Sequence, residues 1–281
     1  MKFCYTKTVG KKVLSDYSKQ SAVAYKDSYW KLGQVLKIYF IDATPEQEIE
    51  FVEIIEEILK PLNLFSDYGT SIEESDIRIS FKEGWGSYSY LGTDALFIPK
   101  DQETINIGWD GKDVMRHEFG HALNLLHEHQ NPNEPIQWNE QVVIDALSGA
   151  PNYWSEEEIR FNVLDSVDSD LVDTTSFDKD SIMLYYFPSS WTLNNFETND
   201  NFTLSEKDKS FLASKYPLDE VEETVVESDL IEFCKNIWTS KSRLNRMLEI
   251  QLVFIANSLG IEASVNDLKK ETLDKVWNKI R

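Results

Sequence analysis

All four histidines of this 281-residue chain lie within one run of thirteen residues, at positions 117, 121, 127 and 129. The run opens the stretch HEFGHALNLLHEHQNP, residues 117–132. Residues four apart on a helix lie on the same face, so His117 and His121 can bind one metal ion together. Catalytic zinc sites use three protein ligands and leave a fourth position for water. The histidine run therefore predicts a zinc site on a helix.

The third ligand has to come from beyond that helix, because the ion lies off the helix face. The chain must turn back, and Asn is the commonest substitute for Gly in the left-handed conformation that such a turn requires. We therefore expect the helix to end at Asn124 and His127 to be the third ligand. Glu118 is the predicted general base, which takes a proton from the zinc-activated water and passes it to the leaving amine. His129 is not needed as a ligand and is expected to be a polar loop residue.

The pattern resembles that of the metzincin metalloproteases, HExxHxxGxxH followed by a methionine turn. Within this group the chain looks most like the astacin-type enzymes, particularly their bacterial relatives. HEFGHALNLLHEHQNP resembles their zinc motif, SIMLYY at 181–186 resembles their SIMHY turn, and SYWKLGQVLKIYF at 28–40 resembles their opening segment. Three features depart from the family: Asn124 stands where glycine is usual, the disulfides common in secreted members are missing, and no standard propeptide is visible.

The resemblance implies an α+β fold: a metzincin-type catalytic domain in which a twisted mixed sheet and the active-site helix lie above a largely irregular lower subdomain. The implied zinc ligands are His117, His121 and His127. Glu118 would be the general base, and Met183 would lie beneath the metal. Tyr185 would ligate zinc and swing to support the oxyanion, and Asn124 would support the site. Substrates of the family lie along an edge strand, and ETINIGW or the neighbouring SYLG would border that cleft.

The hydrophobic pattern predicts the main elements. A strand is expected at 32–41, followed by a helix that Thr44 caps, with Pro45 at its first position and apolar residues at Ile49, Val52, Ile55 and Leu59. Extended pieces are expected at 75–81, 94–99 and 103–109. Residues 130–205 read as loops with short helices, and 204–217 as a capped helix.

Three regions are expected along the chain: an N-terminal extension at 1–21, the catalytic domain at 22–218 and a small helical C-terminal domain at 219–281. The last region begins as an acidic linker and continues with about three amphipathic helices. These helices are a candidate docking surface for a protein partner, and a stabilising cap on the catalytic domain is the equal alternative.

The composition excludes several classes of partner. The net charge of -21 would repel nucleic-acid phosphate and anionic lipid, so we expect neither nucleic-acid binding nor membrane insertion. The two cysteines are far apart in sequence, so no disulfide framework is expected. A signal peptide or transmembrane segment is not visible, which favours a cytoplasmic protein or one exported by a non-classical route.

The sequence thus predicts a zinc-dependent metalloendopeptidase that hydrolyses peptide bonds in extended segments of proteins, with Zn²⁺ as its cofactor. Two alternatives remain open at this point. One is a toxin or effector protease of narrow specificity that acts inside another cell. The other is a catalytically idle metzincin fold that binds a partner through its C-terminal helices, against which the complete set of ligands and base argues.

Overall fold

The computed structural model describes residues 5–7, 25, 27–150, 152–166 and 169–218. Contacts divide the chain into two compact units, residues 1–66 with 72–217 and residues 67–71 with 218–281. The predicted C-terminal helices lie outside the described residues, as does the N-terminal extension apart from residues 5–7. Within the described part, no helix is both long enough and apolar enough to cross a membrane.

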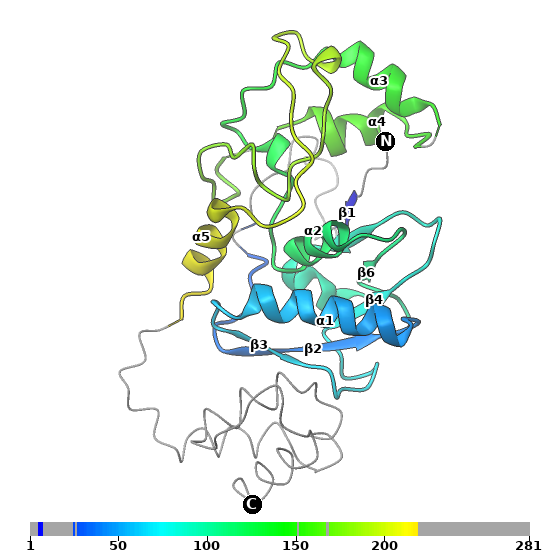
Figure 1. Ribbon diagram of the computed structural model, residues 1–281, viewed down its shortest axis with the longest axis vertical. Helices are drawn as coiled ribbons and strands as arrows, with labels where there is room; N and C mark the ends of the chain where they lie inside the picture. Colours follow the sequence, from blue (N-terminus) through cyan, green and yellow to red (C-terminus); the bar gives the residue numbers. More distant parts are fainter. Residues whose placement is uncertain (1–4, 8–24, 26, 151, 167–168, 219–281) are drawn as a thin grey trace, which may run out of the picture. The chain divides into compact units, whose positions relative to one another are not determined.

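The strands of the described part form one mixed sheet in the order β1-β5-β6-β4-β2-β3 (Figure 1). They are β1 (Tyr5–Lys7), β2 (Gln34–Phe40), β3 (Leu64–Asp67), β4 (Ile77–Ser80), β5 (Tyr88–Tyr90) and β6 (Ile105–Asn106). Strand β4 runs parallel to both β2 and β6, whereas β5 is antiparallel to β6. Strand β1 pairs with β5 in parallel. The mixed sheet with its helices confirms the predicted α+β class.

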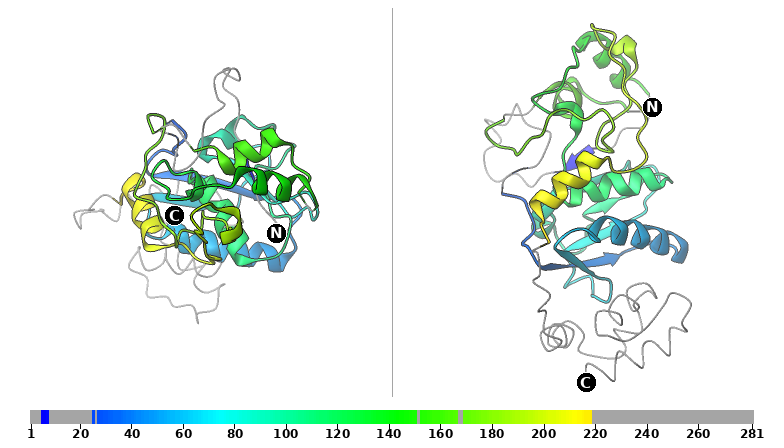
Figure 2. Two further views of the ribbon diagram at one scale, coloured as in Figure 1. Left: turned by 90° about the horizontal axis from the view of Figure 1, so that it is seen from above. Right: turned by 60° about the vertical axis from the view of Figure 1, so that its left-hand side comes forward.

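Helix α1 (Pro45–Leu59) begins as its sequence predicts. The Thr44 side chain accepts from the backbone N–H of Gln47, whose own side chain accepts in return from the Thr44 N–H. Helix α2 (Lys112–Ala122) lies on the same side of the sheet as α1 (Figures 1 and 2). The two helices meet through the rings of Phe51 and Phe119, whose centroids are 6.4 Å apart edge to face. This packing fixes the predicted zinc helix against the sheet layer.

Three local expectations in this half are wrong. Residues 94–99 do not form a strand, because Gly92–Phe97 forms the 3₁₀ helix η1 and Ile98 after it has extended backbone. Strand β3 is not among the expected strands, and neither is β5, which lies in a segment read as a turn. The cause of η1 is tertiary: the guanidinium of Arg78, fully buried beneath it, donates to the carbonyls of Ala95 and Ile98.

The second half of the described chain is largely irregular, as predicted. Its helices are η2 (Glu128–Gln130), α3 (Glu140–Ser148), α4 (Glu156–Ile159), the π-helical turn η3 (Arg160–Leu164), η4 (Ser189–Trp191) and α5 (Glu206–Lys215). A separate apolar core holds this half together, formed by Val143, Leu147, Ile159, Val163, Phe187 and Trp191. Helix α5 is the predicted capped helix, with Ser205 and Asp208 forming its capping box.

Candidate zinc-binding active site

The histidine helix is buried on the face that carries the predicted site. His117 is 7% exposed, while Glu118 and His121, both on α2, are fully buried. Helix α2 ends at Ala122, two residues before the position expected from the sequence, and Leu123 is its C-cap. Because the N-terminal half of the domain packs on the other side of α2, the histidines face the irregular half.

The end of α2 is a Schellman motif built on Asn124. Asn124 has φ 75°, the left-handed conformation expected from the sequence. Its N–H donates to the His121 carbonyl at 2.7 Å, and the next N–H, of Leu125, donates to the Gly120 carbonyl at 2.9 Å. The motif reverses the chain and directs the following residues back under the helix end. His127 is thereby brought beside His121.

Two aromatic side chains complete the end of the helix by capping its last carbonyls. The indole Nε1 of Trp30 donates to the Ala122 carbonyl at 2.7 Å, and the hydroxyl of Tyr216 donates to the Leu123 carbonyl at 3.1 Å. Both aromatic side chains are buried. Carbonyls of a helix terminus that have no helical partner need such bonds when they are buried. Trp30, near the start of the catalytic domain, and Tyr216, near its end, thus stabilise the turn that precedes His127.

Replacing Asn124 tests this turn. The side chain of Asn124 also donates to the Tyr25 carbonyl at 2.8 Å, so Asn124→Gly loses that bond at a cost of about 1 kcal/mol. Asn124→Ala loses the same bond and adds roughly 1–2 kcal/mol for a Cβ in the left-handed region. We expect the Ala variant to be the less stable of the two on urea unfolding and to bind zinc more weakly. Equal stability and equal zinc affinity of the two variants would exclude the proposed role of the turn.

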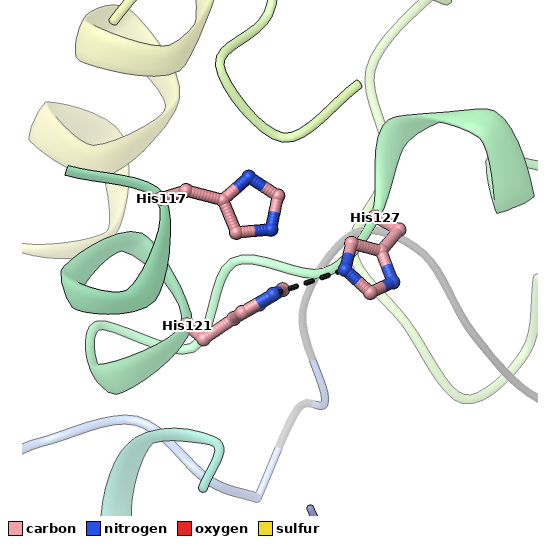
Figure 3. A group of neighbouring side chains, drawn as sticks. All are labelled: His117, His121 and His127. Atoms are coloured by element: carbon pink, nitrogen blue, oxygen red, sulfur yellow. Dashed lines mark hydrogen bonds between the residues drawn. The ribbon is translucent and has the colours of Figure 1, made fainter. Parts of the chain in front are cut away.

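The structure brings the three predicted ligands together (Figure 3). One ligating atom from each of His117, His121 and His127 lies within 4.8 Å of the others. The Nε2 atoms of His121 and His127 are 3.1 Å apart. Zinc–nitrogen bonds of about 2.0–2.1 Å in a tetrahedron place two ligating nitrogens about 3.3–3.4 Å apart, so the His121–His127 pair lies near the spacing that zinc requires.

Backbone carbonyls orient two of these imidazole rings. Nδ1 of His117 lies 2.8 Å from the Ile182 carbonyl, and Nδ1 of His121 lies 2.7 Å from the Leu125 carbonyl. A carbonyl can only accept, so Nδ1 carries the proton and Nε2 keeps its lone pair for the metal. Leu125 therefore serves twice, since its N–H closes the Schellman motif and its carbonyl sets the His121 ring. Nothing in the sequence signals these two carbonyls.

The electrostatic setting keeps the imidazoles neutral. Burial lowers the pKa of His117 to about 4, because the desolvated imidazolium is unfavourable. Burial also lowers the pKa values of His121 and His127 well below the usual value, and the neighbouring histidines lower them further. Neutral imidazole is the form that binds metal. The donor set is thus ready for zinc without the loss of a proton at neutral pH.

Met183 lies beneath the histidines in the segment 181–183. A Cβ added to Gly120 of α2 would come within 2.7 Å of the Met183 sulfur, so helix and methionine are in close contact. The carboxylate of Asp208 in α5 holds the segment, accepting from the Ser181 hydroxyl at 2.7 Å and the Ile182 N–H at 3.0 Å. The capping box of α5 thereby also supports the methionine turn. The sequence indicates Asp208 only as part of a helix cap.

Tyr185 reaches the histidines from the same segment. Its hydroxyl is 2.5 Å from Nε2 of His127, and its ring stacks on that of His117 with centroids 5.6 Å apart and planes inclined by 16°. Glu118, between the two histidines of α2 in sequence, is fully buried. Tyr185 thus lies against the predicted ligands His117 and His127, and the role of Glu118 stays a prediction.

His129 differs from its expectation as a polar loop residue. It is 1% exposed and lies in η2, with its ring 5.3 Å from that of His127 and 4.9 Å from that of Tyr185. Its aromatic neighbours are Trp138, nine residues on, and Phe187 from a distant part of the sequence. Because these contacts form only in the folded chain, the local sequence could not show that His129 is buried.

Comparison with known proteins agrees with this geometry. Residues 65–213 match the model of the peptidase family "Astacin". A solved structure of myroilysin is 34% identical, with a TM-score of 0.67, and the match covers 70% of this chain and 99% of that one. A crystal structure of myroilysin is also 34% identical, with a TM-score of 0.53 and coverages of 69% and 87%.

A hatching-enzyme zinc-protease from the medaka fish Oryzias latipes is 16% identical, with a TM-score of 0.48 and coverages of 66% and 92%. No curated protein sequence matches the chain. The family match spans more than half of the chain and ends inside α5, so it includes the three histidines, the methionine turn and Tyr185. The chain belongs to the astacin family of zinc metalloendopeptidases, and His117, His121 and His127 form its zinc-binding cluster.

Proposed function

We propose that this metalloendopeptidase hydrolyses extended segments of proteins, with Glu118 as the general base and Tyr185 as the donor to the oxyanion. The observation that carries the proposal is the meeting of three neutral, buried imidazoles with the Tyr185 hydroxyl, which lies 2.5 Å from His127. Two of the imidazoles come from α2, the helix that also carries Glu118. When bound, zinc lowers the pKa of water and polarises the scissile carbonyl.

The residues of the chain divide the remaining work. The Glu118 carboxylate takes a proton from the attacking water and returns it to the leaving amine. The Tyr185 hydroxyl donates to the oxygen that becomes negative as the carbonyl carbon turns tetrahedral. The Ile182 and Leu125 carbonyls keep the His117 and His121 rings in place during these steps. No covalent intermediate with the protein is needed.

The sheet favours a substrate that binds in an extended conformation. Strand β6 lies inside the sheet between β4 and β5, so the segment ETINIGW does not offer a free edge. Strand β5 lies next to β6, and its other neighbour is the three-residue strand β1. A peptide that adds as a strand along β5 therefore has to take the place of Tyr5–Lys7. This favours the segment that contains β5, SYLG, as the border of the cleft.

Cleavage mapping tests the substrate class. A library of proteome-derived peptides is incubated with the zinc-loaded protein, and the cuts are located by mass spectrometry. One cleaved sequence is then made both as a linear peptide and as a stably closed β-hairpin. We expect internal cuts, with the linear form cleaved much faster than the hairpin. Equal rates for both forms would count against an extended substrate.

Tyr185→Phe tests the role of the hydroxyl. Loss of one donor to an oxyanion costs about 10²- to 10³-fold in turnover, so we expect kcat to fall by that order while zinc content stays near that of the parent. The ring stacking on His117 is retained by Phe, which makes the variant a specific probe of the hydroxyl. Steady-state kinetics and metal analysis on the same samples check this. Unchanged turnover would show that the ring only packs.

A further inference from the structure

His129 is held by an element of unusual geometry. The turn η3 (Arg160–Leu164) is a π-helix, closed by the Asp165 N–H, which donates to the Arg160 carbonyl at 2.9 Å. Such turns are rare and frequently occur at functional sites. The Asn162 carbonyl of this turn lies 3.0 Å from Nε2 of His129. A backbone carbonyl only accepts, so Nε2 carries the proton and the tautomer of His129 is fixed.

The other ring nitrogen of His129 does not explain why this residue is a histidine. Its Nδ1 atom is buried and has no hydrogen-bond partner among the residues that the structure describes. An apolar ring of similar size would fill the same space without leaving a buried acceptor unpaired, which is unfavourable. The presence of a histidine at this position is therefore explained by the hydrogen bond of Nε2 to the π-turn, which a phenylalanine could not make.

The ring of Tyr185 lies against the anchored imidazole. The two centroids are 4.9 Å apart with planes inclined by 31°, and His117 stacks on the same phenol ring. Phe187 contacts both Tyr185 and His129 edge to face. The phenol is thus enclosed by rings, and two of them, His117 and His129, are tied to backbone carbonyls of the irregular half, His129 to a carbonyl of the π-turn.

We propose that His129 is a positioning residue for Tyr185: its ring, tied to the Asn162 carbonyl of the π-turn, fixes the orientation of the phenol beside His127. The inference rests on the proposed function, because it assigns to His129 the alignment of the hydroxyl that donates to the oxyanion. A shift of about 1 Å in a catalytic group is enough to slow a reaction by two orders of magnitude.

The test is a double-mutant cycle of His129→Phe and Tyr185→Phe. His129→Phe keeps a planar ring but loses the bond to the π-turn. We expect it to lower kcat on the order of tenfold, a part of what loss of an oxyanion donor costs, with KM within about twofold and zinc affinity within about threefold. In the Tyr185→Phe background the same change should have almost no further effect, because the hydroxyl it aligns is gone.

A matched control removes one buried hydrogen bond elsewhere in the same half. The Thr192 hydroxyl is buried and can donate its one proton to the Phe196 carbonyl at 2.9 Å or the Ser189 carbonyl at 3.1 Å, so Thr192→Val should keep the kcat of the parent. Should His129→Phe fail to fold, His129→Gln takes its place in the cycle, since it keeps a donor but lacks the ring. A full tenfold loss in the Tyr185→Phe background, or no loss in the parent, would overturn the proposal.

A second readout separates this inference from the role of Tyr185 itself. The visible bands of the Co²⁺-substituted protein report the groups around the metal without any turnover. We expect His129→Phe to shift these bands when Tyr185 is present and to leave them unchanged in the Tyr185→Phe background. If Tyr185→Phe keeps the turnover of the parent, the oxyanion role fails, and the Co²⁺ bands alone decide: a shift that needs Tyr185 supports the positioning role, and one that does not overturns it.

Discussion

Glu118→Gln is expected to bind zinc as the parent does and to lose nearly all peptide hydrolysis. The glutamine has almost the same shape as the glutamate, so the packing around this fully buried side chain is preserved and only the proton acceptor is removed. General-base catalysis contributes on the order of 10²- to 10⁴-fold, and turnover should fall by at least that much. The three imidazoles are untouched, so zinc affinity should stay within about threefold.

The measurement is the rate of peptide cleavage by samples whose zinc content has been shown to be stoichiometric. Asp113→Asn is a suitable control, because it also removes a carboxylate from α2 but in the first turn of the helix, and it should keep most of its turnover. Substantial turnover by metal-replete Glu118→Gln would remove Glu118 from the role of general base.

His127→Ala is expected to have the largest effect on the metal. Loss of a residue that only orients a ligand lowers metal affinity about 10- to 100-fold, and loss of a ligand should lower it by more than that. Hydrolysis should be lost as well, since two ligands from α2 cannot hold the ion in place. Asn124, which reverses the chain to bring His127 to the site, is unchanged in this variant, so the effect reports the imidazole alone.

Thermal unfolding with and without zinc checks this expectation independently of activity. Zinc at about 1,000 times its dissociation constant stabilises a folded protein by about 4 kcal/mol, and the parent should show a rise in Tm that reflects this. His127→Ala should show little rise at the same zinc concentration. An equal rise in parent and variant, together with equal zinc content after mild chelation, would show that His127 is not a ligand.

The parts of the fold that local sequence determines are predictable from it. Thr44 and Pro45 specify the start of α1, and the histidine spacing specifies both α2 and the metal that its face binds. The left-handed turn at Asn124 also follows from one residue, because few side chains other than Asn and Gly accept that conformation. In each case the residue lies within a few sequence positions of the feature that it determines.

The parts that distant contacts determine are not predictable in this way. Residues 94–99 have the composition of a strand, yet 94–97 form part of η1 because Arg78 binds the carbonyls of Ala95 and Ile98 from within the core. The rings of His117 and His121 take their orientation from the carbonyls of Ile182 and Leu125, which any residue could supply. The expectation for His129 is wrong for the same reason, since its anchor is a carbonyl of a π-turn distant in sequence.

The hydroxyl of Tyr216 on the Leu123 carbonyl has a consequence for the time at which the enzyme becomes active during synthesis. A nascent chain on the ribosome can form α2 early, because the helix is local, but its end lacks this bond until Tyr216 has left the exit tunnel. Asp208 reaches the methionine turn only shortly before that. Contacts of such long sequence separation form late in folding. The newly made protease therefore completes its active site only after the whole catalytic domain has been translated, which limits cleavage of its own unfolded chain.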